Sequence, residues 1–430
     1  MNRREFICAL GASALPCPTV SPEYDFVVAG GGPAGIAAAV TAGRLGLKVA
    51  LLESQGCLGG IWTAGLLTCL LGFDFSPLDR EILARLKKYD AVAPRKPGTK
   101  TAWIYEPEYL KRVCEDMCEE AGVDFCFGTS VVGSVREGSR ITGVITESKA
   151  GRKEWRAKYF ADCTGDGDLA ARSGCRFSVG NDDGTSAEQP ASLIALLMLP
   201  GKVPLSCVTN DDSNFIPVEI DAKEAFKREL SRVGIVPSYG KPTLFRLRGD
   251  LYALMANHEY GVKVDDDKAI TKATVRARRE IIDMVEALAK KGGEPWKGAR
   301  VITSASYLTH RRARRILGQY TLKLEDLLTG RQFEDGIAGC DFCLDVHAVT
   351  RAMNAKNPAG SPHGYRVKPY QIPLRACRSA DIGNLFMAGR CISGDFLPQA
   401  SYRITGAAVG MGAGVGEAVA KLCKNGEIKI

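Results

Sequence analysis

A glycine-rich turn between a strand and a helix limits most strongly what this chain can fold into. Tyr24–Ala29 is an apolar run of strand length, residues 30–35 read Gly-Gly-Gly-Pro-Ala-Gly, and an alanine-rich helix is expected over 36–45. A second apolar run ends in Glu53, 23 residues after Gly30. A G-x-G-x-x-G turn in this setting, followed by an acid at this spacing, predicts a Rossmann-like dinucleotide-binding unit.

Each position in the turn has a physical reason for its residue. Gly30 allows the tight turn, Gly32 leaves room for a pyrophosphate, and Gly35 lets the helix approach the strand. Pro33 and Ala34 begin the helix, whose free N–H groups and positive dipole end attract phosphate. These five residues are therefore predicted to bind the cofactor.

The residues after the second strand distinguish between cofactors. Glu53 can accept hydrogen bonds from ribose hydroxyls and would repel the 2′-phosphate of NADP, which leaves FAD and NAD. A second glycine-rich loop follows at 54–65, in a position that resembles the extended FAD pattern of glutathione-reductase-type and fumarate-reductase-type flavoproteins. Its L-G-G…T-A-G form resembles the FAD-dependent oxidoreductase family, which includes heterodisulfide-reductase-A-like proteins. The resemblance implies FAD, with further contacts from Ser54, Gly59, Gly60 and Thr63.

Two later glycine turns extend the resemblance. The first ends a strand in Thr-Gly-Asp-Gly-Asp, where Thr164 and Gly165 are expected to approach FAD and Asp168 to cap the next helix. The second follows a strand at 384–390. The remaining contacts that the resemblance implies are Val132 with adenine, Asp395 with the ribityl chain, and Thr405 and Gly406, at the start of a small-residue helix, with the flavin ring. The glycines of that helix equally suit close packing against a neighbour.

The FAD motifs lie at both ends of the chain, which predicts a discontinuous FAD-binding domain made of residues 21–180 and 371–430. The stretch between them, 181–370, is too long for a loop and predicts an inserted substrate domain. A long amphipathic helix is expected there over 263–291, and an early strand at Gln189–Leu193. The expected fold class is α/β, a Rossmann-like FAD-binding domain of the three-layer ββα type that carries an α+β insertion.

An arginine-rich segment in the insertion supplies candidate substrate-binding groups. Residues 311–320 resemble the family motif R-E-S-R-R-I-x-G-x-Y, in which Arg311 and Arg314 are retained. Arg403 stands at the start of the small-residue helix. A guanidinium can bind an anionic substrate or polarise a carbonyl, and the alternative for each arginine is a structural salt bridge.

A histidine in the insertion is the candidate acid or base. Asp345-Val346-His347 matches the family's D-x-H, and only four histidines occur in the chain. An imidazole beside a carboxylate suits proton transfer near neutral pH, and the alternative is a histidine of the core. We therefore expect His347, Arg311, Arg314 and Arg403 as catalytic residues.

Composition excludes several classes of protein. The net charge of +8 is mild for 430 residues, and the densest basic run, 310–315, lacks interleaved aromatic residues, so nucleic acid binding is not expected. That run fits either an anion pocket or a solvated helix face. There is no run of eighteen apolar residues, so no transmembrane segment is predicted. The fifteen cysteines are dispersed in a pattern that supports neither an iron–sulfur cluster nor another metal site.

The N-terminus has features of a targeting signal. Residues 1–20 carry Arg-Arg-Glu-Phe at 3–6 and then a weakly apolar run, which resembles a twin-arginine export signal. The protein would then be exported to the periplasm. The alternative is a frayed N-terminus on a cytoplasmic protein.

These features together predict an FAD-dependent oxidoreductase that transfers hydride or electrons between the flavin and a small organic substrate, anionic if the arginines bind it. Because no second dinucleotide motif follows a strand, the electron acceptor or donor is left unidentified. Two alternatives are an iron–sulfur-linked electron-transfer protein of the heterodisulfide-reductase-A-like kind, and a non-redox flavin-dependent isomerase or hydratase.

Overall fold

The computed structural model describes residues 19–73, 75–94, 102–181, 189–210, 218–311, 314–360 and 362–426. Residues 1–18, which hold nearly all of the expected export signal, lie outside this range, so the signal stays a prediction. The described chain begins in the short strand β1 (Thr19–Val20), which pairs with β10.

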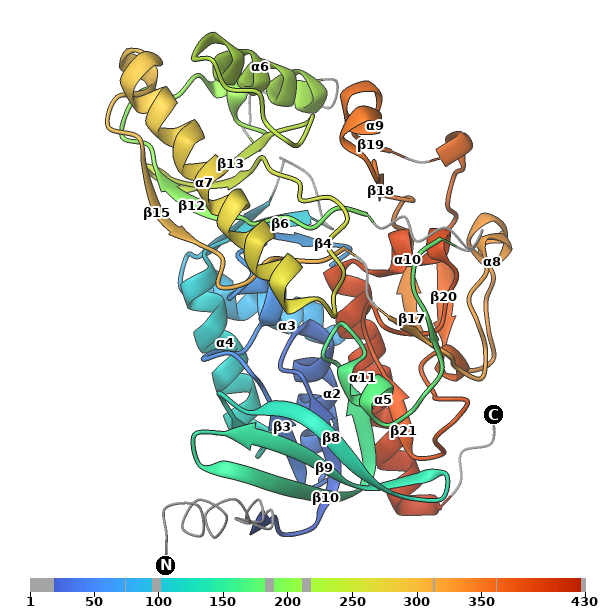
Figure 1. The fold of residues 1–430 in the computed structure, drawn as a ribbon. Coiled ribbons are helices and arrows are strands. Elements are labelled where there is room, and N and C mark those ends of the chain that lie inside the picture. Colours follow the sequence, from blue (N-terminus) through green and yellow to red (C-terminus); the bar gives the residue numbers. More distant parts are fainter. Residues whose placement is uncertain are drawn as a thin grey trace, which may run out of the picture.

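A buried parallel sheet organises the FAD-binding part (Figure 1). The strand order is β7 (Asp124–Cys126), β3 (Val49–Leu52), β2 (Tyr24–Ala29), the second half of β10 (Gly151–Asp162) and β21 (Leu385–Met387). The first half of β10 continues into an antiparallel meander with β9 (Arg140–Ser148) and β8 (Ser130–Glu137). The apolar runs that predicted β2 and β3 thus form the centre of the sheet.

Helices complete the three layers of this part. They are α2 (Pro33–Arg44), α3 (Pro77–Lys88), α4 (Pro107–Glu120) and α11 (Thr405–Asn425). In Figure 1, α11 runs beside α2 although the two are far apart in sequence. Their backbones touch because side chains are missing at the contact: a Cβ at Gly412 would overlap the carbonyl oxygen of Ala34, and one at Gly416 would lie 2.6 Å from that of Ala38. The glycines of α11 therefore do serve close packing.

A second, antiparallel sheet forms the upper part in Figure 1. Its strand order is β13 (Thr243–Arg248), β14 (Leu251–Met255), β12 (Ala195–Met198) and β15 (Arg300–Ser304), and it is accompanied by α6 (Val218–Arg232) and α7 (Asp267–Lys291). The expected amphipathic helix is confirmed as α7. The expected strand at Gln189–Leu193 is wrong, because Ala191 and Ser192 form only isolated bridges and the strand begins at Ala195.

The remaining strands and helices are short. They are β4 (Cys69–Leu71), β5 (Val92–Pro94) and β6 (Ala102–Tyr105) in one sheet; the pairs β11 (Phe177–Ser178) with β16 (Arg315–Ile316), β17 (Gly336–Cys340) with β20 (Tyr370–Pro373), and β18 (Val346–His347) with β19 (Ala359–Gly360); and the helices α5 (Asp168–Arg172), α8 (Leu324–Thr329), α9 (Arg351–Lys356) and α10 (Phe396–Tyr402). In Figure 1, β18 and α10 lie where the two parts meet.

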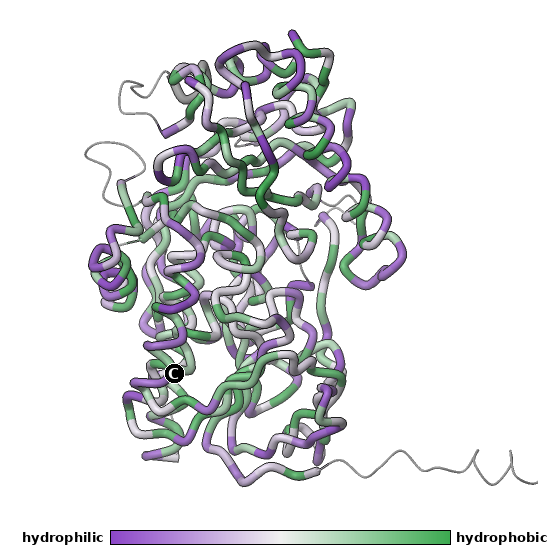
Figure 2. Tube along the Cα trace, turned by 90° about the vertical axis from the view of Figure 1, so that its left-hand side faces the viewer, coloured by the Kyte–Doolittle hydropathy of each residue, from purple (hydrophilic) through white to green (hydrophobic). Residues whose placement is uncertain are grey.

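Two hydrophobic cores correspond to these parts, and Figure 2 shows hydrophobic segments running through the interior of both. The first core includes the parallel sheet and also residues between Ile316 and Leu344. The second spans 191–308 and adds Leu66. We therefore propose that the inserted domain runs from about residue 190 to about residue 310, in place of 181–370. Among the described residues, no helix is both long enough and apolar enough to cross a membrane.

The fold is thus the expected α/β class, a Rossmann-like domain with mixed and antiparallel sheets.

Candidate functional site

The first glycine turn forms an open cradle at the start of α2. Gly30 has a φ of +97°, which favours glycine, and a Cβ at Gly35 would overlap the Gly30 carbonyl oxygen. Gly32 is the N-cap of α2, and no atom lies within 4 Å of the position that its Cβ would take. Pro33 and Ala34 form the first helical turn, so free N–H groups border open space there.

Glu53 ties the two glycine loops together. It is buried at the end of β3, where one carboxylate oxygen accepts the N–H of Gly31 at 2.7 Å. The other accepts the N–H of Gln55 at 2.7 Å and the hydroxyl of Ser54 at 3.1 Å. Glu53 therefore holds the first glycine turn in place. It also positions Ser54, which was predicted to contact the cofactor.

The second glycine loop closes over the first. Gly59 and Gly60 both have positive φ, and a Cβ at Gly60 would lie 2.9 Å from the Cα of Gly32. The Thr63 hydroxyl is buried and donates to the Leu58 carbonyl at 2.5 Å. The loops thus meet along main chain, which allows a ligand to contact backbone from both.

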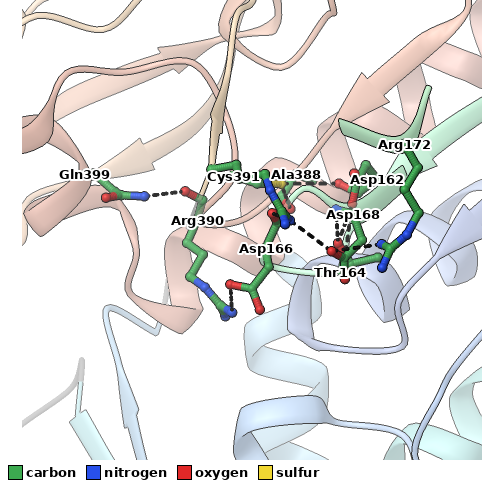
Figure 3. A network of polar contacts seen from close by, with 10 residues as sticks. Asp162, Thr164, Asp166, Asp168, Arg172, Ala388, Arg390, Cys391 and Gln399 are labelled. Atoms are coloured by element: carbon green, nitrogen blue, oxygen red, sulfur yellow. Dashed lines mark hydrogen bonds and ion pairs between the residues drawn. The ribbon is translucent and has the colours of Figure 1, made fainter. Parts of the chain in front are cut away.

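The third turn, drawn in Figure 3, is anchored by a buried carboxylate. Asp162 accepts the N–H and the hydroxyl of Thr164 and the N–H of Ala170, and burial raises its pKa to about 6. The expectation that Asp168 caps the next helix is wrong. Gly167 is the N-cap of α5 and Asp168 its first residue, whose N–H is accepted by the Thr164 hydroxyl at 2.9 Å.

Arg390 adds a cation that the sequence analysis missed. Its guanidinium pairs with Asp166 at 2.7 Å (Figure 3), and a Cβ at Gly165 would lie 2.6 Å from its Nη1. A Cβ at the preceding residue, Gly389, would lie 3.5 Å from the Cβ of Ala34. The backbone next to Arg390 therefore packs against the start of α2. The available signal was the Gly-Arg pair after a buried strand, which predicted only a turn.

The remaining predicted cofactor contacts occupy different surroundings. Val132 lies at a bulge in the edge strand β8, where the register passes from residue 131 to 133 and leaves it opposite no residue of β9. Thr405 begins α11 with its hydroxyl buried and without a partner among the described residues, and Gly406 packs against Gly72. Asp395 precedes α10, and its carboxylate pairs with Lys323 at 3.0 Å.

These observations fit a bound dinucleotide. The open cradle at Gly32 is bordered by a helix N-terminus, and the buried Thr405 hydroxyl and Arg390 Nε have no partner among the described residues. Buried polar groups are usually partnered, so such atoms mark a place for a ligand. The roles of the individual residues toward FAD stay predictions.

The arginine-rich segment is neither a solvated face nor, where it is described, a helix. Arg315 is buried in β16 and its Nη1 donates to the Gly180 carbonyl at 2.9 Å. Arg314 pairs with Asp168 at 3.0 Å, beside the third glycine turn. Arg311 turns away from both, towards the inserted domain. Arg312 and Ala313 lie outside the described residues.

His347 lies in a buried ion-pair network at the end of β18. Its Nε2 is 3.2 Å from Asp345 Oδ2, and the same oxygen is 2.9 Å from Nη2 of Arg403. Burial alone would raise the pKa of Asp345, but His347, Arg403 and Arg311 lower it well below its usual range. An ionised carboxylate only accepts, so His347 Nε2 carries the proton and Nδ1, buried without a partner among the described residues, is a bare acceptor.

Arg311 belongs to the same network electrostatically. Its Nη1 donates to the Pro190 carbonyl at 2.7 Å and to the Ser192 hydroxyl at 2.8 Å. Burial, together with Arg403, lowers the pKa of Arg311 to about 10, so it remains a cation at neutral pH. Burial and this cation lower the pKa of His347 to about 4. The structure therefore brings together three of the four predicted catalytic residues and leaves out Arg314.

Three further aromatic rings complete the cluster, and the sequence analysis singled out none of them. The His258 ring is stacked on Tyr239 at 4.1 Å and lies 5.1 Å from the His347 ring, measured between centroids. Tyr260 donates to the Ser238 carbonyl and lies 3.4 Å from His258 Nδ1, so Nδ1 donates to the tyrosine oxygen and Nε2 is bare. No local motif marks His258, which is why pattern reasoning passed over it.

Comparison with known families and proteins agrees with the geometry at the glycine turns. The family described as FAD dependent oxidoreductase matches residues 25–429. The chain belongs to this family. It is therefore an FAD-dependent oxidoreductase, and the expected cofactor, FAD, is confirmed at the level of the family.

Individual relatives are more distant. A digeranylgeranylglycerophospholipid reductase of Methanospirillum hungatei JF-1 is 29% identical over 146 residues, which cover 31% of this chain and 36% of that protein. The match thus spans about a third of the curated relative. Among solved structures, a geranylgeranyl bacteriochlorophyll reductase-like protein of Thermoplasma acidophilum has a TM-score of 0.47 at 12% identity and covers 95% of this chain and 80% of that chain. The p-nitrophenol 4-monooxygenase of Pseudomonas putida DLL-E4 has a TM-score of 0.47 at 14% identity and covers 96% and 82%.

Proposed function

We propose that this FAD-dependent oxidoreductase oxidises a small anionic organic substrate bound at the cluster of Arg311, Asp345, His347 and Arg403. The observation that carries the proposal is the bare, buried Nδ1 of His347, in one network with two arginines. Such an arrangement combines an anion-binding group with a proton acceptor.

The cofactor end and the substrate end meet in sequence at α11. Arg403 is the C-cap of α10 and stands two residues before Thr405, which begins α11. The helix start that the resemblance assigns to the flavin is thereby joined to the network of His347. When bound, FAD supplies a two-electron acceptor, and the protein supplies binding, orientation and proton transfer.

Each residue of the network has a distinct part. Arg311 binds the anionic group of the substrate, because its Nη1 alone has partners among the described residues and its other N–H groups are available. His347 Nδ1 takes the proton released when a hydroxyl group is oxidised. Asp345 holds the ring by accepting from Nε2, and it stabilises the imidazolium that forms.

Substrate binding would also strengthen the base. Burial and Arg311 lower the pKa of His347 to about 4 in the free protein. An anion on Arg311 offsets the positive charge, so the pKa of His347 rises towards its ordinary value when substrate is present. The proton acceptor is thus weak without substrate and stronger with it.

A matched pair of compounds tests the proposal. Anaerobic mixing of the holoenzyme with small 2-hydroxycarboxylates and with their neutral amides, for example lactate and lactamide, is followed by flavin absorbance. We expect carboxylates to reduce the flavin and amides of the same shape to reduce it at least tenfold more slowly. Equal rates for acids and amides would contradict an anion site. Among the described residues, no observation favours the iron–sulfur alternative or the non-redox alternative.

A further inference from the structure

Four buried nitrogen atoms without a hydrogen-bond partner among the described residues gather around His347. They are Nδ1 of His347, Nε2 of His258, Nε2 of Gln189 and Nε of Arg403. Gln189 belongs here because its carbonyl oxygen accepts the backbone N–H of His347 at 2.9 Å. Since buried polar groups are nearly always paired, four such atoms in one cluster indicate a polar ligand that pairs with them together.

The four atoms divide into two kinds. Gln189 and Arg403 offer N–H donors, and Arg311 beside them is a cation. His258 and His347 offer bare ring nitrogens, which are acceptors, and their ring centroids are 5.1 Å apart. A complementary ligand therefore has an anionic end that accepts hydrogen bonds. It also has two hydrogen-bond donors that are close enough together to reach the two histidine rings.

Charge decides which donors the ligand carries. An ammonium and a hydroxyl both donate to an imidazole nitrogen, but burial, and after it Arg311, lowers the pKa of both His258 and His347. A site that disfavours the imidazolium also disfavours an ammonium group. Neutral hydroxyl groups are therefore the donors that the surroundings favour.

A cavity lies beside the cluster and shares one residue with it, His258. Its volume is about 560 Å³, and its lining includes His258, Tyr260, Glu280 and Arg351. This size is in the range of small-molecule sites. His258 borders the cavity with 2% of its surface exposed, and its ring centroid lies 5.1 Å from that of His347.

We propose that the ligand of this cluster is a carboxylate with hydroxyl groups on two adjacent carbons, and that His258 recognises the second hydroxyl. This inference rests on the proposed function, because it places the first hydroxyl at His347 and the carboxylate at Arg311. Gln189 and Arg403 donate hydrogen bonds to the same carboxylate group as Arg311. His258 is thereby a specificity-determining residue that touches substrate.

A series of three-carbon acids tests the inference directly. Glycerate carries two hydroxyls, lactate one and propanoate none. Binding is measured by anaerobic calorimetry on the holoenzyme with its flavin reduced beforehand, so that no acid is oxidised during the titration. We expect each hydroxyl to tighten binding by about tenfold. His258→Phe should lower the affinity for glycerate to that for lactate and leave lactate and propanoate unchanged. His258→Gln retains an acceptor near the Nε2 position and should keep most of the preference for glycerate.

The outcomes separate the two levels of the proposal. If glycerate and lactate bind equally to the wild-type protein, the second hydroxyl site is wrong while the anion site stands. If His258→Phe folds with full FAD and still prefers glycerate, His258 is not the recognition group. If no acid of the series binds, the carboxylate site fails as well. The wild-type comparison decides the main point even if the His258→Phe protein does not fold.

Discussion

The cradle at the start of α2 is formed by main chain, whereas the cluster around His347 is formed by side chains. Gly60 approaches Gly32 closely because it carries no side chain, and a Cβ at Gly32 would enter open space. Gln189, His258, His347 and Arg403 come from distant parts of the sequence and meet only in the folded protein. A main-chain site tolerates no added atoms, while a side-chain site depends on charge and hydrogen bonding, so the two should respond to different substitutions.

The largest effect is expected at the cradle. Gly32→Leu should weaken FAD binding more than about a hundredfold, because a side chain would occupy the open space beside the helix N-terminus. The apoprotein should still fold, since the backbone of Gly32 has an ordinary φ of −77°. FAD content and the Tm of the apoprotein are the measurements. The exposed Gly383, substituted in the same way, should keep its FAD; loss of FAD there as well would mean that any added leucine disturbs the fold.

The second comparison uses two neighbouring arginines. Arg311→Met should weaken binding of a small carboxylate by about 10- to 100-fold without loss of FAD, because it removes a charged hydrogen-bond donor. Arg314→Met removes the ion pair with Asp168 and should lower the Tm with little effect on carboxylate binding. Calorimetry and thermal unfolding measure the pair. Equal loss of carboxylate binding in both variants would place Arg314 in the substrate site after all.

A smaller effect separates two candidate cofactor residues. Arg390→Met should weaken FAD binding by about tenfold, because Arg390 adjoins the start of α2 and its Nε has no partner among the described residues. Asp395→Asn should change FAD binding by less than about threefold if its role is the pair with Lys323. Titration of the apoproteins with FAD measures both. The reverse order would support the ribityl contact implied by resemblance.

The smallest effect is a shift in a pH profile. His347 must be unprotonated to accept a proton. The value of kred/Kd for flavin reduction should therefore be constant above the pKa of His347 and should fall as the pH drops through about 4. In Arg311→Met the nearby positive charge is gone, so the acid limb should move upward, towards the ordinary histidine pKa of about 6.5. Stopped-flow measurements of kred/Kd against pH test this. An acid limb that stays in place would show that Arg311 does not act on His347.

Sequence predicted the cradle well because its requirements are local. Gly30, Gly35 and Glu53 satisfy constraints of backbone angle, close approach and hydrogen bonding set within thirty residues of chain. Asp168 was misassigned as a cap because the residue before it is a glycine that itself adopts the N-cap position. Local rules name the turn but not which of two adjacent residues begins the helix.

The substrate cluster could be predicted only in part. His347 and Asp345 are two residues apart, so their pairing was visible. Arg311 was named by resemblance, and Arg403 by its place at the start of the small-residue helix. The separation of Arg314 from Arg311 depends on how the chain leaves the third glycine turn, and His258 reaches the cluster through tertiary packing. No periodicity or residue spacing in the sequence indicates either the separation of the two arginines or the position of His258.

The central claim is that FAD and substrate are held by separate groups, with His347 serving only the second. The most direct measurement is the rate of flavin reduction by a hydroxycarboxylate in His347→Ala, with FAD content determined on the same sample. We expect a rate about a hundredfold lower than that of the wild-type protein, at unchanged FAD content. A wild-type rate in fully loaded His347→Ala protein would contradict it.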